Sequence, residues 1–166
     1  MWMCMPCFKW IKMIKVLFIC HGNICRSPMA EFLFKNYVKN KGKEKSFLIE
    51  SAATSTEEIG NGVHYGTKRI LNSLGIDCSN KRARQITKLD YDNFDYLIGM
   101  DEWNINNILR IVGKDINNKI YKLLDFTNLK RDIKDPWYTG NFTETYEDIM
   151  IGIEGFYNYL NKNLIL

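Results

Sequence analysis

Four short runs of apolar residues divide the chain, and each is followed by a longer segment with the hydrophobic spacing of a helix. We predict that these runs are buried strands, at residues 15–20, 47–51, 94–100 and 120–124. Strands that alternate with helices form parallel sheets through right-handed crossovers. The pattern therefore predicts an α/β fold: a single domain of three layers, with a four-stranded parallel sheet and helices on both faces.

Helix boundaries are marked by capping residues. Ser27 and Pro28 start the first helix, because serine caps free N–H groups and proline at the first helical position loses no hydrogen bond. Gly75 closes the second helix, Asp101 caps the third, and Asn141 resembles half of a capping box for the last. We expect helices over about 28–41, 65–74, 102–112 and 142–160, with inward faces at Ile70, Leu71 and Leu74, at Ile105, Ile108 and Leu109, and at Tyr146, Ile149, Met150, Ile153, Tyr157 and Leu160.

Composition excludes several classes of protein. The 166 residues are 46% hydrophobic, 13% aromatic and 25% charged, which are ordinary values for one globular domain. The net charge of +4 comes without a basic arm, so we expect no nucleic-acid partner. The apolar run before Cys20 is far shorter than the roughly 20 residues that span a bilayer, so we expect no stable membrane insertion.

The five cysteines are odd in number and irregularly spaced, which argues against a secreted disulfide framework and for a cytoplasmic location. Two of them, Cys4 and Cys7, lie in a segment rich in Met and Trp that has no acidic residue. We expect residues 1–13 to be a flexible extension and residues 14–166 to form the domain. Cys4 and Cys7 lack a second pair of metal ligands nearby, so no metal site is expected, while lipidation of these two thiols stays open.

The strongest chemical signal is the loop after the first strand, which reads CHGNICRSP over residues 20–28. Cys20 is a candidate nucleophile, since a helix N-terminus and the Arg26 guanidinium would both stabilise its thiolate. Gly22 and Asn23 tolerate backbone conformations that let successive N–H groups converge on a phosphate-sized anion. Arg26 adds a bidentate fork for two phosphoryl oxygens, and the Ser27 hydroxyl is placed to donate to the Cys20 sulfur.

This loop resembles the signature of the low-molecular-weight protein tyrosine phosphatase family, Cys-x5-Arg-Ser near the N-terminus. The resemblance extends from residue 15 to about residue 162 and includes ESAATS (50–55), ARQIT (83–87), FDY (94–96), MDE (100–102) and DPW (135–137). It implies a phosphatase domain and a cysteinyl-phosphate mechanism without a cofactor. It also implies that phosphate or substrate is held by His21, Gly22, Asn23, Ile24, Cys25 and Ser27.

The resemblance also assigns the second half of the reaction. Asp135 would protonate the tyrosine leaving group and then accept a proton from the attacking water, on a loop restricted by Pro136. Ser27 and Ser51 would support the strained Asn23. The family often carries a histidine at the position of Lys81, so this part of the supporting network is open.

The entrance to the site is expected to be aromatic. Trp137 and Tyr138 stand where the family lines a deep slot for the phosphotyrosine ring, which phosphoserine is too short to use. Glu57 replaces an aromatic residue found in many relatives, so we expect acidic flanking residues to be disfavoured. Cys25 resembles the second loop cysteine of the family, which can form a protective disulfide with an oxidised nucleophile. We favour this role over the alternative of a small buried filler, because a thiolate of low pKa is the species most prone to oxidation.

Three alternatives remain open. An arsenate reductase on the same scaffold would need two further cysteines a helical segment apart, where only Cys78 is present. A protein-arginine phosphatase would carry a smaller threonine in place of Ile24. A non-catalytic phosphate-binding module would normally have lost Cys20 or Asp135, and both are kept. We therefore favour a monomeric phosphatase whose partners are phosphotyrosine-containing proteins.

Overall fold

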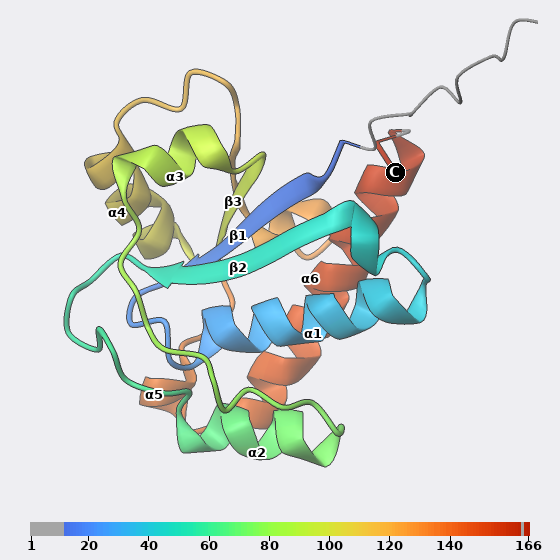
Figure 1. Cartoon of the computed structure of the whole chain (residues 1–166). Coiled ribbons are helices and arrows are strands. Elements are labelled where there is room, and N and C mark those ends of the chain that lie inside the picture. The colour runs from blue at the N-terminus through green and yellow to red at the C-terminus, as the bar shows by residue number, and fades with distance from the viewer. Residues whose placement is uncertain (1–11, 164) are drawn as a thin grey trace, which may run out of the picture.

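The computed structural model describes residues 12–163 and 165–166, and its centre is a sheet whose strands match the four predicted apolar runs (Figure 1). The strands are β1 (Ile14–Cys20), β2 (Phe47–Ala53), β3 (Tyr96–Gly99) and β4 (Ile120–Lys122). They lie in the order β2-β1-β3-β4, and all three pairings are parallel. The four-stranded parallel sheet is thus confirmed. Cys4 and Cys7, which were assigned to the N-terminal extension, lie outside the described residues.

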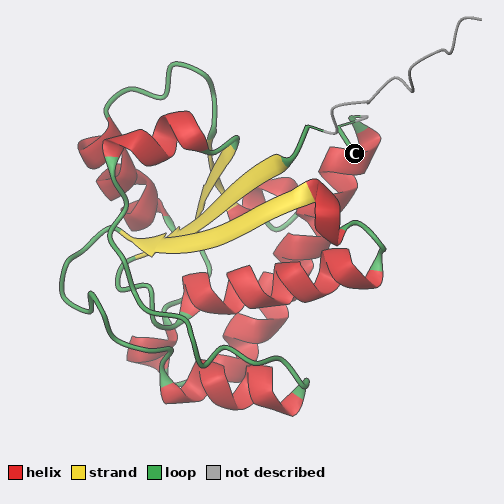
Figure 2. Cartoon of the chain, viewed as in Figure 1, coloured by secondary structure: helices red, strands yellow, loops and turns green. Residues whose placement is uncertain are grey.

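Helices cover both faces of this sheet, as Figures 1 and 2 show. One face carries α1 (Arg26–Asn40), α2 (Tyr65–Ser73) and α6 (Phe142–Lys162), and the other carries α3 (Lys88–Asn93) and α4 (Glu102–Val112). Short helical turns complete the chain as η1 (Glu44–Ser46), η2 (Leu123–Phe126) and α5 (Pro136–Thr139). No helix in the described part of the chain is long and apolar enough to cross a membrane. The three predicted layers are therefore present.

Strand β1 is apolar from Val16 to Cys20 because both of its faces are buried there. Val16 and Phe18 pack into the core beneath α1 and α6, while Leu17 and Ile19 point into the smaller core beneath α3 and α4. All four side chains are fully buried. A continuous apolar run of this kind is typical of a strand in a parallel sheet with two covered faces.

Several predicted boundaries were wrong. Residues 123 and 124 were expected in the fourth strand, but Leu123 and Leu124 belong to η2, where both side chains are buried against the core below the sheet. The third strand is shorter than predicted and runs from Tyr96 to Gly99, because Phe94 is the C-cap of α3, a helix that was not predicted. Leu74 was expected to face inward and is 47% exposed, since α2 ends at Ser73.

The sheet order places the CHGNICRSP loop at the centre of the molecule. Strand β1 lies between β2 and β3, so the loop that leaves Cys20 starts in the middle of the carboxyl edge of the sheet. The chain leaves β1 toward β2 on one side, while β3 lies on the other. Ligands of open α/β sheets bind at such a switch point, where neighbouring loops diverge.

Gly155 on α6 allows a close approach to the turn that precedes the Asp135 loop. A Cβ atom at Gly155 would lie 2.6 Å from the Phe126 carbonyl oxygen and 2.9 Å from Thr127 Cγ2. We expect Gly155→Ala to lower the free energy of unfolding by about 1–3 kcal/mol, since a backbone oxygen cannot yield as a flexible side chain can.

Urea denaturation measures this effect. Asn158→Ala, at an exposed position of the same helix, is the control and should leave the stability unchanged or raise it slightly. A Gly155→Ala protein as stable as wild type would show that α6 and η2 can separate without cost.

Candidate active site

The loop after β1 folds back around the sulfur of Cys20. The Asn23 N–H lies 3.3 Å from Cys20 Sγ, and the Ser27 hydroxyl lies 3.0 Å from it. Helix α1 begins at Arg26, and the residue at its cap position, Cys25, makes no side-chain cap. The prediction that Ser27 caps this helix was therefore wrong: Ser27 lies inside the first turn, and its hydroxyl contacts the sulfur.

Asn23 adopts the left-handed conformation proposed from the sequence, with a φ of 58°. Its side chain is buried and fully hydrogen-bonded: Nδ2 donates to Ser27 Oγ at 2.7 Å and to Ser51 Oγ at 2.9 Å, and Oδ1 accepts from the Arg84 N–H at 3.2 Å. Such a backbone conformation costs energy in a residue other than glycine and persists only where its surroundings hold it. These three hydrogen bonds hold the loop in its curled form.

Lys81 completes the layer beneath Asn23. Ser51 Oγ donates to Glu31 Oε1 at 2.6 Å, and Lys81 Nζ contacts both the Ser51 carbonyl oxygen at 2.9 Å and Glu31 Oε1 at 3.1 Å. The lysine that departs from the family pattern thus takes part in the supporting network. His64 instead caps α2, where its Nδ1 accepts the Gly66 N–H.

Arg26 is 2% exposed, and its guanidinium lies among acidic groups. Its Nη1 donates to Asp101 Oδ2 at 2.6 Å and to the Ile133 carbonyl oxygen at 2.9 Å, and its Nη2 lies 3.4 Å from Asp135 Oδ2. Burial disfavours the charge, but the nearby Cys20, Asp101 and Asp135 outweigh burial and raise the pKa of Arg26. The guanidinium therefore stays a cation.

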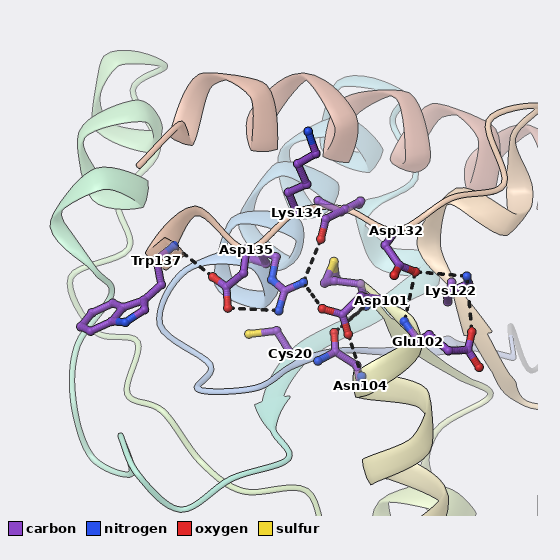
Figure 3. A network of polar contacts seen from close by, with 12 residues as sticks. Cys20, Asp101, Glu102, Asn104, Lys122, Asp132, Lys134, Asp135 and Trp137 are labelled. Atoms are coloured by element: carbon purple, nitrogen blue, oxygen red, sulfur yellow. Dashed lines mark hydrogen bonds and ion pairs between the residues drawn. The ribbon is translucent and has the colours of Figure 1, made fainter. Parts of the chain in front are cut away.

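Asp135 faces the site from the start of α5. Its Oδ1 accepts the Trp137 N–H at 3.0 Å and so caps this short helix, which leaves Oδ2 toward Arg26. Figure 3 shows Asp135 and Asp101 close to Cys20, and both carboxylates contact the Arg26 guanidinium. The Asp135-Pro136 segment, expected as a loop, is the junction of a loop with α5.

A cavity of about 600 Å³ brings most of the predicted residues together. Its lining includes the predicted Cys20, His21, Gly22, Ile24, Cys25, Arg26, Glu57, Asp135, Trp137 and Tyr138. Asn23, Ser27 and Ser51 are buried behind the loop instead, where they support it. No group of three or more His, Cys, Asp or Glu residues suited to a metal ion occurs in residues 12–163 and 165–166.

Sequence reasoning missed four residues of the site. Asp101 was predicted only as a helix cap, yet it also holds Arg26, and Trp103 and Glu58 line the cavity beside it. Glu31 was not singled out at all. The signal for Asp101 was present, because it follows the carboxyl end of β3 directly. The other three depend on how distant segments pack, which residue spacing does not reveal.

The mouth of the cavity is aromatic on one side and acidic on another. Trp137 is 59% exposed and Tyr138 is 83% exposed, although aromatic side chains usually find cover. Glu57 Oε2 lies 3.1 Å from His21 Nε2 at the mouth. A thiol, a cation and a carboxyl group at the bottom, with aromatic walls above, can cleave an aryl phosphate ester.

Comparisons with known proteins agree with this geometry. The family model described as "Low molecular weight phosphotyrosine protein phosphatase" matches residues 15–165. The low molecular weight protein-tyrosine-phosphatase YfkJ of Bacillus subtilis is 43% identical over 144 residues, which cover 86% of this chain and 92% of YfkJ. The corresponding phosphatase PtpA of Staphylococcus aureus is 32% identical over 152 residues, which cover 91% of this chain and 96% of PtpA.

Solved structures give the same result. The crystal structure of YfkJ superposes with a TM-score of 0.88 at 41% identity and covers 92% of this chain and 97% of its own. The structure of SP-PTP from Streptococcus pyogenes, also 41% identical, has a TM-score of 0.77 and covers 90% of this chain and 93% of its own. The chain therefore belongs to the low molecular weight protein tyrosine phosphatase family.

Proposed function

We propose that this chain hydrolyses phosphotyrosine in proteins, and small aryl phosphates, through a phosphate ester on Cys20. The observation that carries the proposal is the meeting of Cys20, Arg26 and Asp135 in one cavity at the carboxyl edge of the sheet. Each supplies a different requirement of the reaction: a nucleophile, a cation for the transferred group, and a proton donor for the leaving oxygen.

Binding begins with the phosphoryl group above the Cys20 sulfur. The loop that curls around the sulfur and the N-terminus of α1 direct backbone N–H groups toward the cavity, and Arg26 offers its fork from the side. Negative charge that develops on the phosphoryl oxygens in the transition state is stabilised by groups already in place. The Asp101 and Ile133 contacts keep Arg26 oriented for this purpose.

Chemistry proceeds in two displacements. The Cys20 thiolate attacks phosphorus and forms the S–P bond while the P–O bond to the tyrosine oxygen breaks, and Asp135 gives its proton to that oxygen. A water molecule then attacks the same phosphorus, loses a proton to Asp135, and releases Cys20 and inorganic phosphate. The Ser27 hydroxyl, 3.0 Å from the sulfur, donates a hydrogen bond to the departing thiolate.

Phosphotyrosine is the substrate that the cavity shape favours. The exposed rings of Trp137 and Tyr138 can stack on a phenyl group whose phosphate reaches Cys20, whereas phosphoserine is too short to use these walls. Ile24 adds an apolar lining that suits a ring more than a guanidinium. Glu57 brings negative charge to the mouth, so peptides with acidic flanking residues are disfavoured.

Cys25 protects the nucleophile in this proposal. Peroxide oxidises the Cys20 thiolate to a sulfenic acid, and the Cys25 thiol then displaces water from it to form a disulfide that added thiol reduces. Burial, followed by the nearby Cys20 and Asp135, raises the pKa of the Cys25 thiol. Cys25 therefore remains a thiol while Cys20 acts as the nucleophile.

The wider setting follows from the same chemistry. We propose that residues 14–166 act as a monomeric phosphatase domain in the cytoplasm, because a catalytic thiol needs a reducing compartment and one chain supplies all of the cavity lining described above. Nucleic acid is not among its partners, because the chain carries no basic arm. An arsenate reductase is not favoured, since the relatives are tyrosine phosphatases.

Turnover of p-nitrophenyl phosphate tests the enzyme assignment. We expect wild type to hydrolyse it, and Cys20→Ser to lose activity by on the order of 10³-fold or more because the hydroxyl is a far weaker nucleophile. Cys78→Ser, which changes a buried cysteine outside the cavity, is the matched control and should stay active. An inactive wild type, or a Cys20→Ser protein with normal activity, would refute the proposal.

Arg26→Lys tests the need for a fork. A lysine keeps the positive charge but cannot bind two phosphoryl oxygens in one plane, so we expect kcat/KM to fall on the order of 10²-fold. Arg110→Lys, at an exposed position on α4, should match wild type. Full activity in Arg26→Lys would mean that charge alone is sufficient.

Recovery from peroxide tests the protective disulfide. After brief peroxide treatment, wild type and Cys78→Ser should regain activity when thiol is added, and Cys25→Ser should regain less because its Cys20 is oxidised beyond the sulfenic acid. The three proteins are compared by activity before and after reduction. Equal recovery in Cys25→Ser would contradict the protective role.

A further inference from the structure

The segment that carries Asp135 has little regular structure of its own, yet it is attached to the rest of the molecule at every residue from 131 to 134. Ile133 is fully buried. Its N–H donates to the Met100 carbonyl oxygen at 2.9 Å, and its own carbonyl oxygen accepts a hydrogen bond from Arg26 Nη1. Lys134 Nζ lies 3.4 Å from Glu144 on α6. These contacts raise the question of which one sets the position of the Asp135 carboxyl group.

Asp132 joins this segment to the beginning of α4. Its Oδ1 accepts the Glu102 N–H at 3.1 Å and lies 3.2 Å from Lys122 Nζ, which comes from the end of β4 (Figure 3). Burial lowers the pKa of Lys122, but its contacts with Asp132 and Glu102 outweigh burial, so the pKa is raised overall. Asp132 thus pairs with a cation and caps a helix N-terminus with the same oxygen.

The beginning of α4 is also the part of the fold that holds Arg26. Asp101 binds the guanidinium with its carboxylate, and the next residue, Glu102, binds Asp132 with its N–H. The beginning of α4 therefore holds both Arg26 and the segment that carries Asp135. Arg131 anchors the other side of the segment through two hydrogen bonds to the buried Asp148 on α6, at 2.8 and 2.9 Å.

An ordinary surface ion pair would be the simpler interpretation, because Asp132 is about half exposed and such pairs add little stability. The position of the Asp135 carboxyl group matters more here than the stability that the ion pair adds. A general acid must lie within hydrogen-bond reach of the leaving oxygen, and a displacement of about 1 Å can cost up to about 10²-fold in rate. Only two residues separate Asp132 from Asp135, so the contacts of Asp132 with Glu102 and Lys122 restrain the backbone that leads to Asp135.

We propose that Asp132 is a positioning residue that holds the Asp135 carboxyl group at the leaving oxygen by fixing its segment to the N-terminus of α4. This inference rests on the proposed function, in which Asp135 is the general acid. It predicts that kcat/KM, which reports the cleavage step, falls most for esters whose leaving group needs a proton.

The test compares kcat/KM for phenyl phosphate with kcat/KM for p-nitrophenyl phosphate, whose leaving group is a much stronger acid and needs less protonation. We expect Asp132→Ala to lose about tenfold more activity on phenyl phosphate than on p-nitrophenyl phosphate. Asp135→Asn should show the same selectivity more strongly. Inhibition by inorganic phosphate should be unchanged in Asp132→Ala, which reports an intact Arg26 and a folded protein.

Glu102→Gln is the matched control, because it removes the other carboxylate beside Lys122 and keeps the backbone N–H that Asp132 caps. It should show the wild-type ratio. The same loss of ratio in Glu102→Gln as in Asp132→Ala would assign the effect to charge and overturn the proposal.

The remaining outcomes separate the two levels of inference. If Asp135→Asn is selective and Asp132→Ala keeps the wild-type ratio, only the positioning role fails. If Asp135→Asn keeps the wild-type ratio, the role of general acid fails, and the positioning role fails with it.

Discussion

The buried guanidinium of Arg26 is the constraint on which the site depends. A cation in a residue that is 2% exposed must be paired, and its partners come from two separate parts of the chain: Asp101 directly after β3, and the segment before α5 that supplies the Ile133 carbonyl and Asp135. Leaving such a charge unpaired would cost several kcal/mol. The need to satisfy Arg26 therefore brings the segments of the reaction to the sulfur of Cys20.

Much of the fold could be predicted from the sequence because short apolar runs typical of strands alternate with segments that have the hydrophobic spacing of helices. A run such as 16–20, apolar on both faces, has few interpretations other than a central parallel strand. Boundaries were less predictable, because they depend on tertiary contacts. Leu123 and Leu124 continue the apolar pattern of β4, but their side chains are buried only when the backbone turns into η2.

The residues of the site also divide into those that local sequence predicts and those that it does not. Cys20 and Arg26 lie in one continuous motif, where local chemistry suggests their roles, whereas Asp135 was recognised only through the family resemblance. Lys81 illustrates what a pattern leaves open: although it stands where the family often has a histidine, its long side chain reaches Glu31 and the Ser51 carbonyl oxygen. Ser27 shows the reverse, since a residue that commonly caps a helix contacts sulfur here.

The central claim is that phosphate is transferred to the Cys20 sulfur within a cradle organised by Arg26. Mass spectrometry of the protein quenched during turnover of an aryl phosphate tests this claim most directly, because the covalent intermediate would appear as one added phosphoryl group. We expect this group on the peptide that contains Cys20, and we expect it to disappear when the substrate is exhausted. A phosphoryl group on another residue, or active enzyme that never carries one, would contradict it.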